Sequence, residues 1–317
     1  MAVHSKAQRL TSRLAVQGLA AALLIAAAAY LVFNTLANLE TRRIASGFAF
    51  LWREAGFEVG ESAFLAYSAA DSYAKALAVG LANTFKVALL GIVAATVLGT
   101  AIGLLRLSGS PLLRNLSSLY VEFLRNVPLL VQLFFWYALF TEALPPPREA
   151  LSTLPGVFFT NRGIFFPTFS GVPALQGFNF SGGGALSPEF VTLLVGLSLY
   201  TAAFIAEIVR AGVIAVRRDQ WLAARALGLE ERHVLRHVVA PQALRVIVPP
   251  LTSQYLNLTK NSSLAVAIGY PDLVSIANTT INQTGQAIEG IAIIMAVYLS
   301  ISLAISALMN WYNARLR

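Results

Sequence analysis

The sequence contains no cysteine and only three histidines among 317 residues. The absence of cysteine excludes disulfide bonds, thiol catalysis and thiolate metal ligands. His233 and His237 lie four residues apart, a spacing that a metal ion can use, but the sequence places no third ligand near them. We therefore interpret this pair as the solvated face of a helix and predict no metal site.

The sequence also lacks a phosphate-binding loop. No Gly-x-x-x-x-Gly-Lys-Ser/Thr motif is present, and no glycine-rich loop precedes any of the lysines at positions 6, 75, 86 and 260. Such a loop is needed to hold the phosphates of a nucleotide in the common ATPases. We predict that the chain has no catalytic residue and binds no cofactor, so that any ATP and Mg²⁺ are bound by a different subunit.

Charged residues are scarce. They make up 12% of the chain, against about 25% in a typical soluble domain, while hydrophobic residues make up 57%. About 20 apolar residues suffice to span a bilayer as a helix. Six apolar runs meet this need, if the third extends upstream of Pro128: residues 14–36, 79–105, 128–140, 190–209, 243–258 and 290–309. The sequence therefore predicts an all-α integral membrane protein with about six transmembrane helices.

The basic residues predict the orientation of these helices. If the N-terminus is cytoplasmic, six spans place most arginines in cytoplasmic segments, as the positive-inside rule requires. The C-terminus is then cytoplasmic too, and the net charge of +8 reflects topology. No solvated basic patch with interleaved aromatics is present, so we predict no nucleic-acid partner. Residues 1–36 share features with a signal peptide, but the apolar run is too long and lacks a small-x-small cleavage site, which favours an uncleaved anchor.

Residues 219–241 form a polar island between two apolar runs. Ala223 and Ala224 would let another protein approach the helix backbone closely, and Gly228 would end that helix in a left-handed conformation. Asp219 is the expected N-cap of the first helix. Glu230 and Glu231 would lie near the N-terminus of a second helix, where negative charge is favourable. The island is thus interpreted as a docking surface, with contact residues Trp221, Ala223, Ala224, Gly228 and Pro241.

This island resembles the cytoplasmic "EAA" loop of ABC importer permeases, whose pattern is Glu-Ala-Ala, three residues, Gly, nine residues, Ile, one residue, Leu-Pro. Leu222, Val238 and Ala240 replace the Glu, Ile and Leu, whereas the spacing from Gly228 to Pro241 is retained. The segments at 123–140, 198–216 and 258–273 are similar to permeases of the polar amino-acid uptake family. The long segments outside the spans, at 37–78 and 141–189, resemble those of one subgroup of this family. This subgroup is the broad-specificity general L-amino-acid permeases of Gram-negative bacteria.

The resemblance implies a type I ABC importer core of five helices, preceded here by an extra helix. It divides the chain into a tail and anchor helix (1–37), a periplasmic or interfacial segment (38–78), the permease domain (79–313) and a cytoplasmic tail (314–317). Within the permease domain lie a periplasmic insert at 141–189 and the coupling loop at 217–241. The implied partners are two ATP-binding subunits, a second, non-identical permease subunit, a periplasmic amino-acid-binding protein and membrane lipid. The expected location is the bacterial inner membrane.

Polar residues inside spans are costly and therefore informative. Glu207 and Arg210 are three residues apart on one span, which favours an ion pair over a gate. Pro128 is expected to break a helix, and Lys86 is expected to snorkel to the membrane surface. A run of polar residues at 254–263 predicts a discontinuous helix, with Ser262 and Ser263 capping the half-helix that follows. Candidate residues of a substrate path are Asn83, Gln132, Tyr200, Glu207, Asn257, Lys260, Ser262 and Ser263.

Two functions remain compatible with the residues. The first is a transmembrane permease subunit of an ATP-driven importer that moves polar L-amino acids from the periplasm to the cytoplasm. The second is a proton- or ion-coupled secondary amino-acid transporter. A secondary transporter would carry ionisable residues at mid-span and an inverted repeat. We find no repeat, and Glu207 is the main carboxylate well inside a span, which favours the importer.

Overall fold

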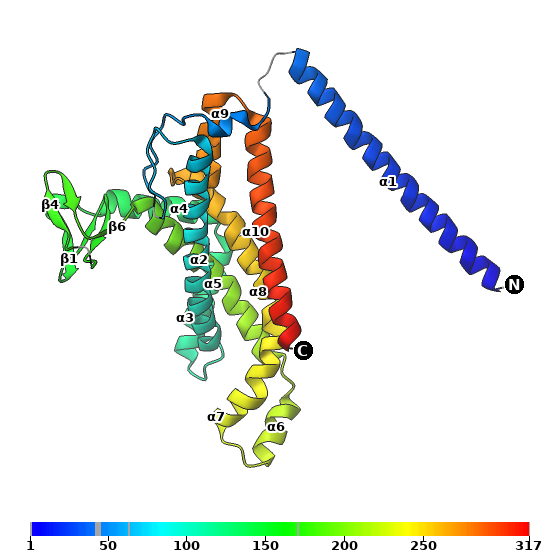
Figure 1. Cartoon of the computed structure of the whole chain (residues 1–317). Helices are drawn as coiled ribbons and strands as arrows, with labels where there is room; N and C mark the ends of the chain where they lie inside the picture. Colours follow the sequence, from blue (N-terminus) through cyan, green and yellow to red (C-terminus); the bar gives the residue numbers. More distant parts are fainter. Residues whose placement is uncertain (1, 42–45, 63, 170, 317) are drawn as a thin grey trace.

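The computed structural model describes residues 2–41, 46–62, 64–169 and 171–316. Figure 1 shows a bundle of long helices, a β-rich part at one side and a long separate helix that includes the N-terminal residues. Residues 217–241 form a bend, here called the elbow, at the end of the bundle where the last helix also finishes (Figure 1). We call this the elbow end of the bundle and the other the opposite end.

Helices make up most of the chain. They are α1 (Ala2–Thr41), the 3-10 turn η1 (Phe48–Trp52), α2 (Tyr73–Leu105), α3 (Pro111–Asn126), α4 (Leu129–Ala138), the π-helical turn η2 (Leu139–Ala143), the 3-10 turn η3 (Pro147–Glu149), α5 (Pro188–Ile214), α6 (Arg218–Ala226), α7 (Glu231–His233), the π-helical turn η4 (Val234–Val239), α8 (Ala240–Asn261), the 3-10 helix η5 (Ser262–Ile268), α9 (Leu273–Thr284) and α10 (Ala287–Leu316).

Four described helices are long and apolar enough to cross a membrane alone: residues 15–35 of α1, together with α2, α5 and most of α10. Two bent pairs reach the same size when each counts as one span. Residues 111–126 and 129–143 are bent by 103°, and residues 231–268 and 273–284 are bent by 51°. The prediction of an all-α membrane protein with about six spanning helices agrees with this arrangement.

The segment between α4 and α5 folds into a β module, which we define as residues 144–186. Four short strands pair antiparallel in the order β1 (Leu151–Leu154), β2 (Val157–Thr160), β3 (Gly163–Phe166) and β6 (Gly184–Leu186). A second sheet pairs β4 (Ala174–Gln176) with β5 (Asn179–Ser181). The Phe180 ring joins the two sheets, because it stacks 4.4 Å from Phe158 and lies 5.2 Å from Phe165. The insert is thus an ordered unit, and the sequence did not predict its strands.

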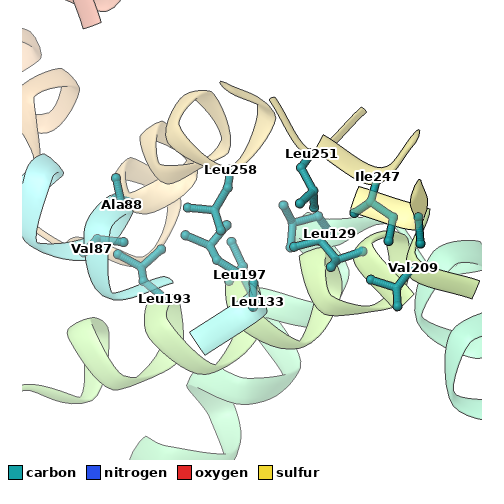
Figure 2. Packing of buried hydrophobic residues seen from close by; sticks show 14 of the residues in the cluster. Val87, Ala88, Leu129, Leu133, Leu193, Leu197, Val209, Ile247, Leu251 and Leu258 are labelled. Atoms are coloured by element: carbon teal, nitrogen blue, oxygen red, sulfur yellow. The ribbon is translucent and has the colours of Figure 1, made fainter. Parts of the chain in front are cut away.

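Apolar side chains from α2, α4, α5 and α8 meet in one buried cluster (Figure 2). The α2 and α5 helices approach most closely where α2 carries glycine. A Cβ atom at Gly99 would lie 2.6 Å from Ile205 Cβ and 2.8 Å from the Ala202 carbonyl oxygen. At Gly103, the Ala206 carbonyl oxygen would be 2.7 Å away. Only glycine permits this separation of the two helix backbones.

The segment before α2 packs against the opposite end of the bundle. Phe50 in the turn η1 is buried, and its ring lies 6.0 Å from that of Tyr73 at the start of α2. Asp71 Oδ2 lies 2.8 Å from Lys75 Nζ, and this hydrogen bond lowers the pKa of the Asp71 carboxyl group.

Candidate coupling and transport sites

The first arm of the elbow is α6, and Gly228 ends it. Gly228 adopts a left-handed conformation with φ of 77°. Its N–H donates to the Arg225 carbonyl (2.9 Å), and the next N–H, of Leu229, donates to the Ala224 carbonyl (3.2 Å). These two bonds form a complete Schellman motif, which satisfies carbonyls that the end of a helix leaves free. The predicted left-handed glycine is therefore confirmed.

The start of α6 differs from the prediction. Arg217, and not Asp219, occupies the N-cap position, and no side chain caps the helix. Asp219 lies in the first turn, where its carboxylate accepts a 2.7 Å bond from Arg217 Nη2. A carboxylate in the first turn still favours the helix dipole. The predicted cap was wrong by two residues, because Arg217 already has the extended backbone that an N-cap requires.

The two arms of the elbow are joined by side chains. Arg225 Nη2 donates to both carboxylate oxygens of Glu231, at 2.8 and 2.7 Å. Glu230 occupies the N-cap position of α7, so both glutamates lie at the helix N-terminus as predicted. Gln242 Nε2 donates to Gln220 Oε1 (3.4 Å). These contacts join the two sides of the elbow at its surface, outside the buried cluster.

The two alanines of the elbow face opposite ways. Ala224 is buried, and Trp221 is half-buried against the main apolar cluster, so both hold the elbow to the bundle. Ala223 is exposed, as are the neighbouring side chains of Leu222 and Leu227. Pro241 is exposed in the first turn of α8. Ala223 is therefore open to solvent between apolar and charged neighbours, whereas the chain itself covers Ala224.

A carboxylate held by two arginines lies near the elbow end of α5. Glu207 accepts a 2.5 Å bond from Arg210 Nη2, and Arg106 Nη1 at the end of α2 donates to its other oxygen. Arg106 also donates to Ser118 of α3 at 3.3 Å. The predicted ion pair with Arg210 is confirmed, whereas the sequence did not reveal Arg106. Its position at the end of an apolar run signalled only a membrane boundary.

A second network lies at the opposite end. Lys86 Nζ is 2.5 Å from Glu61 Oε1 and 3.9 Å from the centre of the Phe190 ring. Ser187 donates to the other oxygen of Glu61 at 2.6 Å. Asn83 Nδ2 donates to the carbonyls of Glu61 (2.7 Å) and Pro271 (2.9 Å). Lys86 therefore forms an ion pair inside the protein, and the expectation that it snorkels was wrong because the sequence did not reveal Glu61 as its partner.

Pro128 breaks the helix as predicted, and Gln132 stabilises the break. The Gln132 amide is buried, and its Nε2 donates to the carbonyls of Leu124 and Val127, each at 2.9 Å. These carbonyls lie at the end of α3, where a proline removes the usual helical donors. The observed contacts give Gln132 a structural role.

The polar run at 254–263 also ends a helix. The α8 helix stops at Asn261, and the tighter helix η5 begins at Ser262. Ser262 and Ser263 donate back to the Thr259 and Lys260 carbonyls, at 2.8 and 2.7 Å. They therefore do not cap the following half-helix, because the backbone continues in a helical conformation and leaves no N-cap position there.

Of the candidate path residues, Asn257 and Lys260 are exposed on one face of α8. Tyr200 is half-buried on α5, and its ring centre lies 5.0 Å from that of Phe204. The Arg125 guanidinium lies 5.0 Å from the centre of the same Phe204 ring. None of the eight candidates lines the hollows around Leu81, Trp221 or Leu31. Asn83, Gln132 and Glu207 form hydrogen bonds or ion pairs within the bundle. Asn257 and Lys260 instead form an exposed polar face of α8.

The sequence and structure match known proteins. Residues 88–317 match the family model described as "Binding-protein-dependent transport system inner membrane component". The chain is 46% identical to the putative amino-acid ABC transporter permease protein YhdX of Escherichia coli K12, covering 95% of this chain and 93% of that protein. It is 42% identical to the general L-amino acid transport system permease protein AapQ of Rhizobium johnstonii, covering 90% of this chain and 88% of that protein.

Solved structures share the arrangement of the helices. A crystal structure of an amino acid ABC transporter with histidines has a TM-score of 0.57 and 27% identity, covering 77% of this chain and 95% of that chain. An inward-facing structure of the MetNI methionine ABC transporter has a TM-score of 0.56 over 77% of this chain and 97% of that chain. At 18% identity, this second match supports the fold alone.

Proposed function

Because this chain belongs to the family of binding-protein-dependent transport system inner membrane components, we propose that it is the permease subunit of an ATP-driven importer that moves polar L-amino acids from the periplasm to the cytoplasm. Relatives described as amino-acid permeases, covering nine-tenths or more of the chain, support this substrate class. The alternative, a proton- or ion-coupled secondary transporter, has no support among these relatives.

The elbow is the observation that carries the mechanism. It is a bend held by the Gly228 motif and the Arg225–Glu231 pair, and it exposes Leu222, Ala223 and Leu227. Such a surface seats in a groove of an ATP-binding subunit, and motion of that subunit then tilts the bend as one piece. Trp221 and Ala224 transmit the tilt, because both pack against the buried cluster of the membrane helices.

The partners follow from this role. Two ATP-binding subunits each accept one elbow, and the second elbow belongs to a second, non-identical permease subunit. A periplasmic binding protein delivers the amino acid at the end opposite the elbow. ATP and Mg²⁺ are bound by the ATP-binding subunits, and no covalent chemistry occurs in this chain.

The exposed polar face of α8 is our proposed part of the substrate path. Asn257 and Lys260 lie three residues apart, and their side chains form no hydrogen bond or ion pair among the described residues. The buried side chains of Gln132 and Asn83, in contrast, donate to backbone carbonyls. An ammonium group at Lys260 suits the carboxylate that every amino acid carries. Lys260→Ala is therefore expected to lower uptake at least fivefold with unchanged assembly, and Lys75→Ala, outside this face, serves as the matched control. Normal uptake by Lys260→Ala would remove the residue from the path.

The proposed function is tested in liposomes that contain the permease pair and the ATP-binding subunits. We expect uptake of a labelled amino acid only when ATP is inside and the binding protein is outside. A protonophore should leave the rate unchanged. Uptake that requires an ion gradient and proceeds without ATP would establish the secondary transporter instead.

A further inference from the structure

The first helix has no neighbour along most of its length. Residues 15–35 of α1 have a mean hydropathy of 2.1, and none of this segment is buried. Figure 1 shows α1 projecting away from the bundle, with its C-terminal end beside the tops of α9 and α10. A helix of this composition crosses the bilayer next to the bundle to which it is tethered.

The bundle carries an apolar groove of about 410 Å³ on the side formed by α2 and α10. Its lining residues are Leu81, Phe85, Ala296, Val297, Ser300, Ile301 and Ala304. The residues from α10 include three small ones at intervals of four, which places them on one ridge of that helix. The small side chains of Ala296, Ser300 and Ala304 therefore let another helix approach the α10 backbone closely on this side of the groove.

This ridge on α10 extends to the end of the helix near α1. Ile288, Ala292, Ala296, Ser300 and Ala304 follow one another at intervals of four residues, and all five are exposed. Small residues at such intervals let membrane helices pack backbone to backbone, which lipid chains cannot reproduce. The ridge thus has the form of a helix-packing surface without a helix on it.

The α1 helix already lies at the top of this ridge. Leu31, Val32 and Thr35 of α1 line one hollow together with Ile288 and Glu289 of α10. Gly47, which follows α1 in the sequence, is also held at α10, because its N–H donates to Glu289 Oε1 at 2.6 Å. The shared hollow brings Leu31, Val32 and Thr35 of α1 to the level of Ile288 at the start of α10.

The same face of α1 continues inward with matching side chains. Counting back from Val32 at helical spacing gives Ala28, Leu24, Ala21 and Gln17. Two of these are small, like the ridge on α10. Gln17 is a polar residue in an otherwise apolar stretch, and such residues in membrane helices face protein more often than lipid.

We propose that α1 packs antiparallel along the α10 ridge and fills the groove between α2 and α10 as an additional helix of the permease. We take Val32 and Ile288, which line the same hollow, as level with each other and count the register from them. From Ile288, Ser300 lies twelve residues inward, which is about 18 Å at 1.5 Å per residue. Ala21 lies about 17 Å inward on α1, opposite Ser300, and Ala28 lies opposite Ala292.

Disulfide cross-linking tests this register directly, because the chain has no native cysteine. The complete transporter is oxidised in membranes, and free thiols are then counted by the gel shift that a maleimide polymer gives. We expect a disulfide within one chain for the pair Ala28→Cys with Ala292→Cys and for the pair Ala21→Cys with Ser300→Cys. Neither cysteine of such a pair then reacts with the maleimide polymer, so both gel shifts disappear. Leu19→Cys with Ser300→Cys is the matched control, since Leu19 lies at similar depth on the far face of α1 and should keep both shifts.

Three outcomes would overturn the proposal. Disulfides that join two subunits would place α1 on the partner permease. If both test pairs keep both gel shifts, no disulfide has formed, and the groove is filled by lipid rather than by α1. Equal cross-linking of the Leu19 pair would show that α1 rotates freely and has no fixed packing face. Expression and uptake of each variant before oxidation establish that the substitutions leave the transporter intact.

Discussion

Gly228 combines a left-handed backbone with open space around it. A Cβ atom added there would meet no atom within 4 Å, so Gly228→Ala adds only backbone strain, about 1 kcal/mol. We expect the copurified ATP-binding subunit to fall about fivefold for this variant, because 1.4 kcal/mol corresponds to a tenfold change in binding. Gly228→Val should lower it further, because a branched side chain is more restricted.

The matched control for Gly228 is Gly109→Ala. Gly109 also has open space, but its backbone is outside the left-handed region. Both variants should insert into the membrane at normal levels, since neither position is buried. Full ATP-dependent uptake by vesicles that carry Gly228→Val would contradict the coupling role of the elbow.

Glu207 provides a second test at the scale of one residue. Glu207→Gln removes the charge between Arg106 and Arg210, and leaves two partly buried guanidinium groups facing each other. We expect a loss of stability on the order of 1–3 kcal/mol, because a partner of a charged hydrogen bond is left unpaired. The midpoint of thermal unfolding in detergent measures this change.

Glu122→Gln is the control for Glu207→Gln, because Glu122 is exposed on α3 and forms no ion pair among the described residues. Its unfolding midpoint should not change. If Glu207→Gln is as stable as the native chain but transports at a different rate, the ion pair acts as a gate rather than as a structural contact.

At the scale of helices, the contact between α2 and α5 depends on glycine. Gly99→Val should prevent this contact, because even the Cβ atom would meet Ile205 and the Ala202 carbonyl at less than 3 Å. The cost of overpacking is typically 1–3 kcal/mol. We expect low recovery of folded permease by size-exclusion chromatography in detergent.

Gly91→Ala is the matched change on the same helix. Its Cβ atom would meet only the flexible end of Leu258, at 3.3 Å. This variant should be recovered at normal levels. Equal loss of both variants would show that α2 needs glycine to fold or insert as a helix, whether or not the glycine contacts α5.

The sequence predicted elements well where the signal is local. Apolar runs, Pro128 and Gly228 act through their immediate neighbours, and the helices, the break and the left-handed turn occur where they were predicted. The strands of the β module were missed, although Pro155 and Gly156 mark the turn between β1 and β2. Strands of three or four residues are too short for their alternation to stand out from a loop.

Contacts between distant segments were the main omission at the candidate sites. Glu61 is 25 residues from Lys86 and Arg106 is 101 residues from Glu207. One sequence contains no sign that these charges meet, because pairing at such distances depends on how helices pack. The polar residues were therefore identified, whereas their partners and hence their roles were not.

At the scale of the whole molecule, the orientation in the membrane is testable because the chain has no cysteine. We expect a membrane-impermeant maleimide to label Ser152→Cys in the β module from the periplasmic side. Asp219→Cys in the elbow should react only after the inner membrane is opened. The reason is the excess of arginine in the segments that share a side with the elbow.

Both positions are exposed in the structure, so a difference in labelling reflects the membrane and not burial. A permeant maleimide, which should label both variants in closed cells, is the control for thiol reactivity. Labelling of Asp219→Cys from the periplasm would invert the topology and remove the elbow from any cytoplasmic ATPase.

The α2–α5 pair is clamped at both ends. Arg106 and Glu207 join the helices near the elbow, and Lys86, Glu61 and Ser187 join them at the other end. Because Gly99 and Gly103 also bring the two helix backbones close together between these clamps, we expect α2 and α5 to move as one unit, here called the beam. The two bent spans beside it, at Pro128 and at residues 269–272, have no such clamp, so we expect bending during transport to occur there. Substitutions along the beam should decide whether the protein assembles, whereas substitutions at the two joints should alter how fast it cycles.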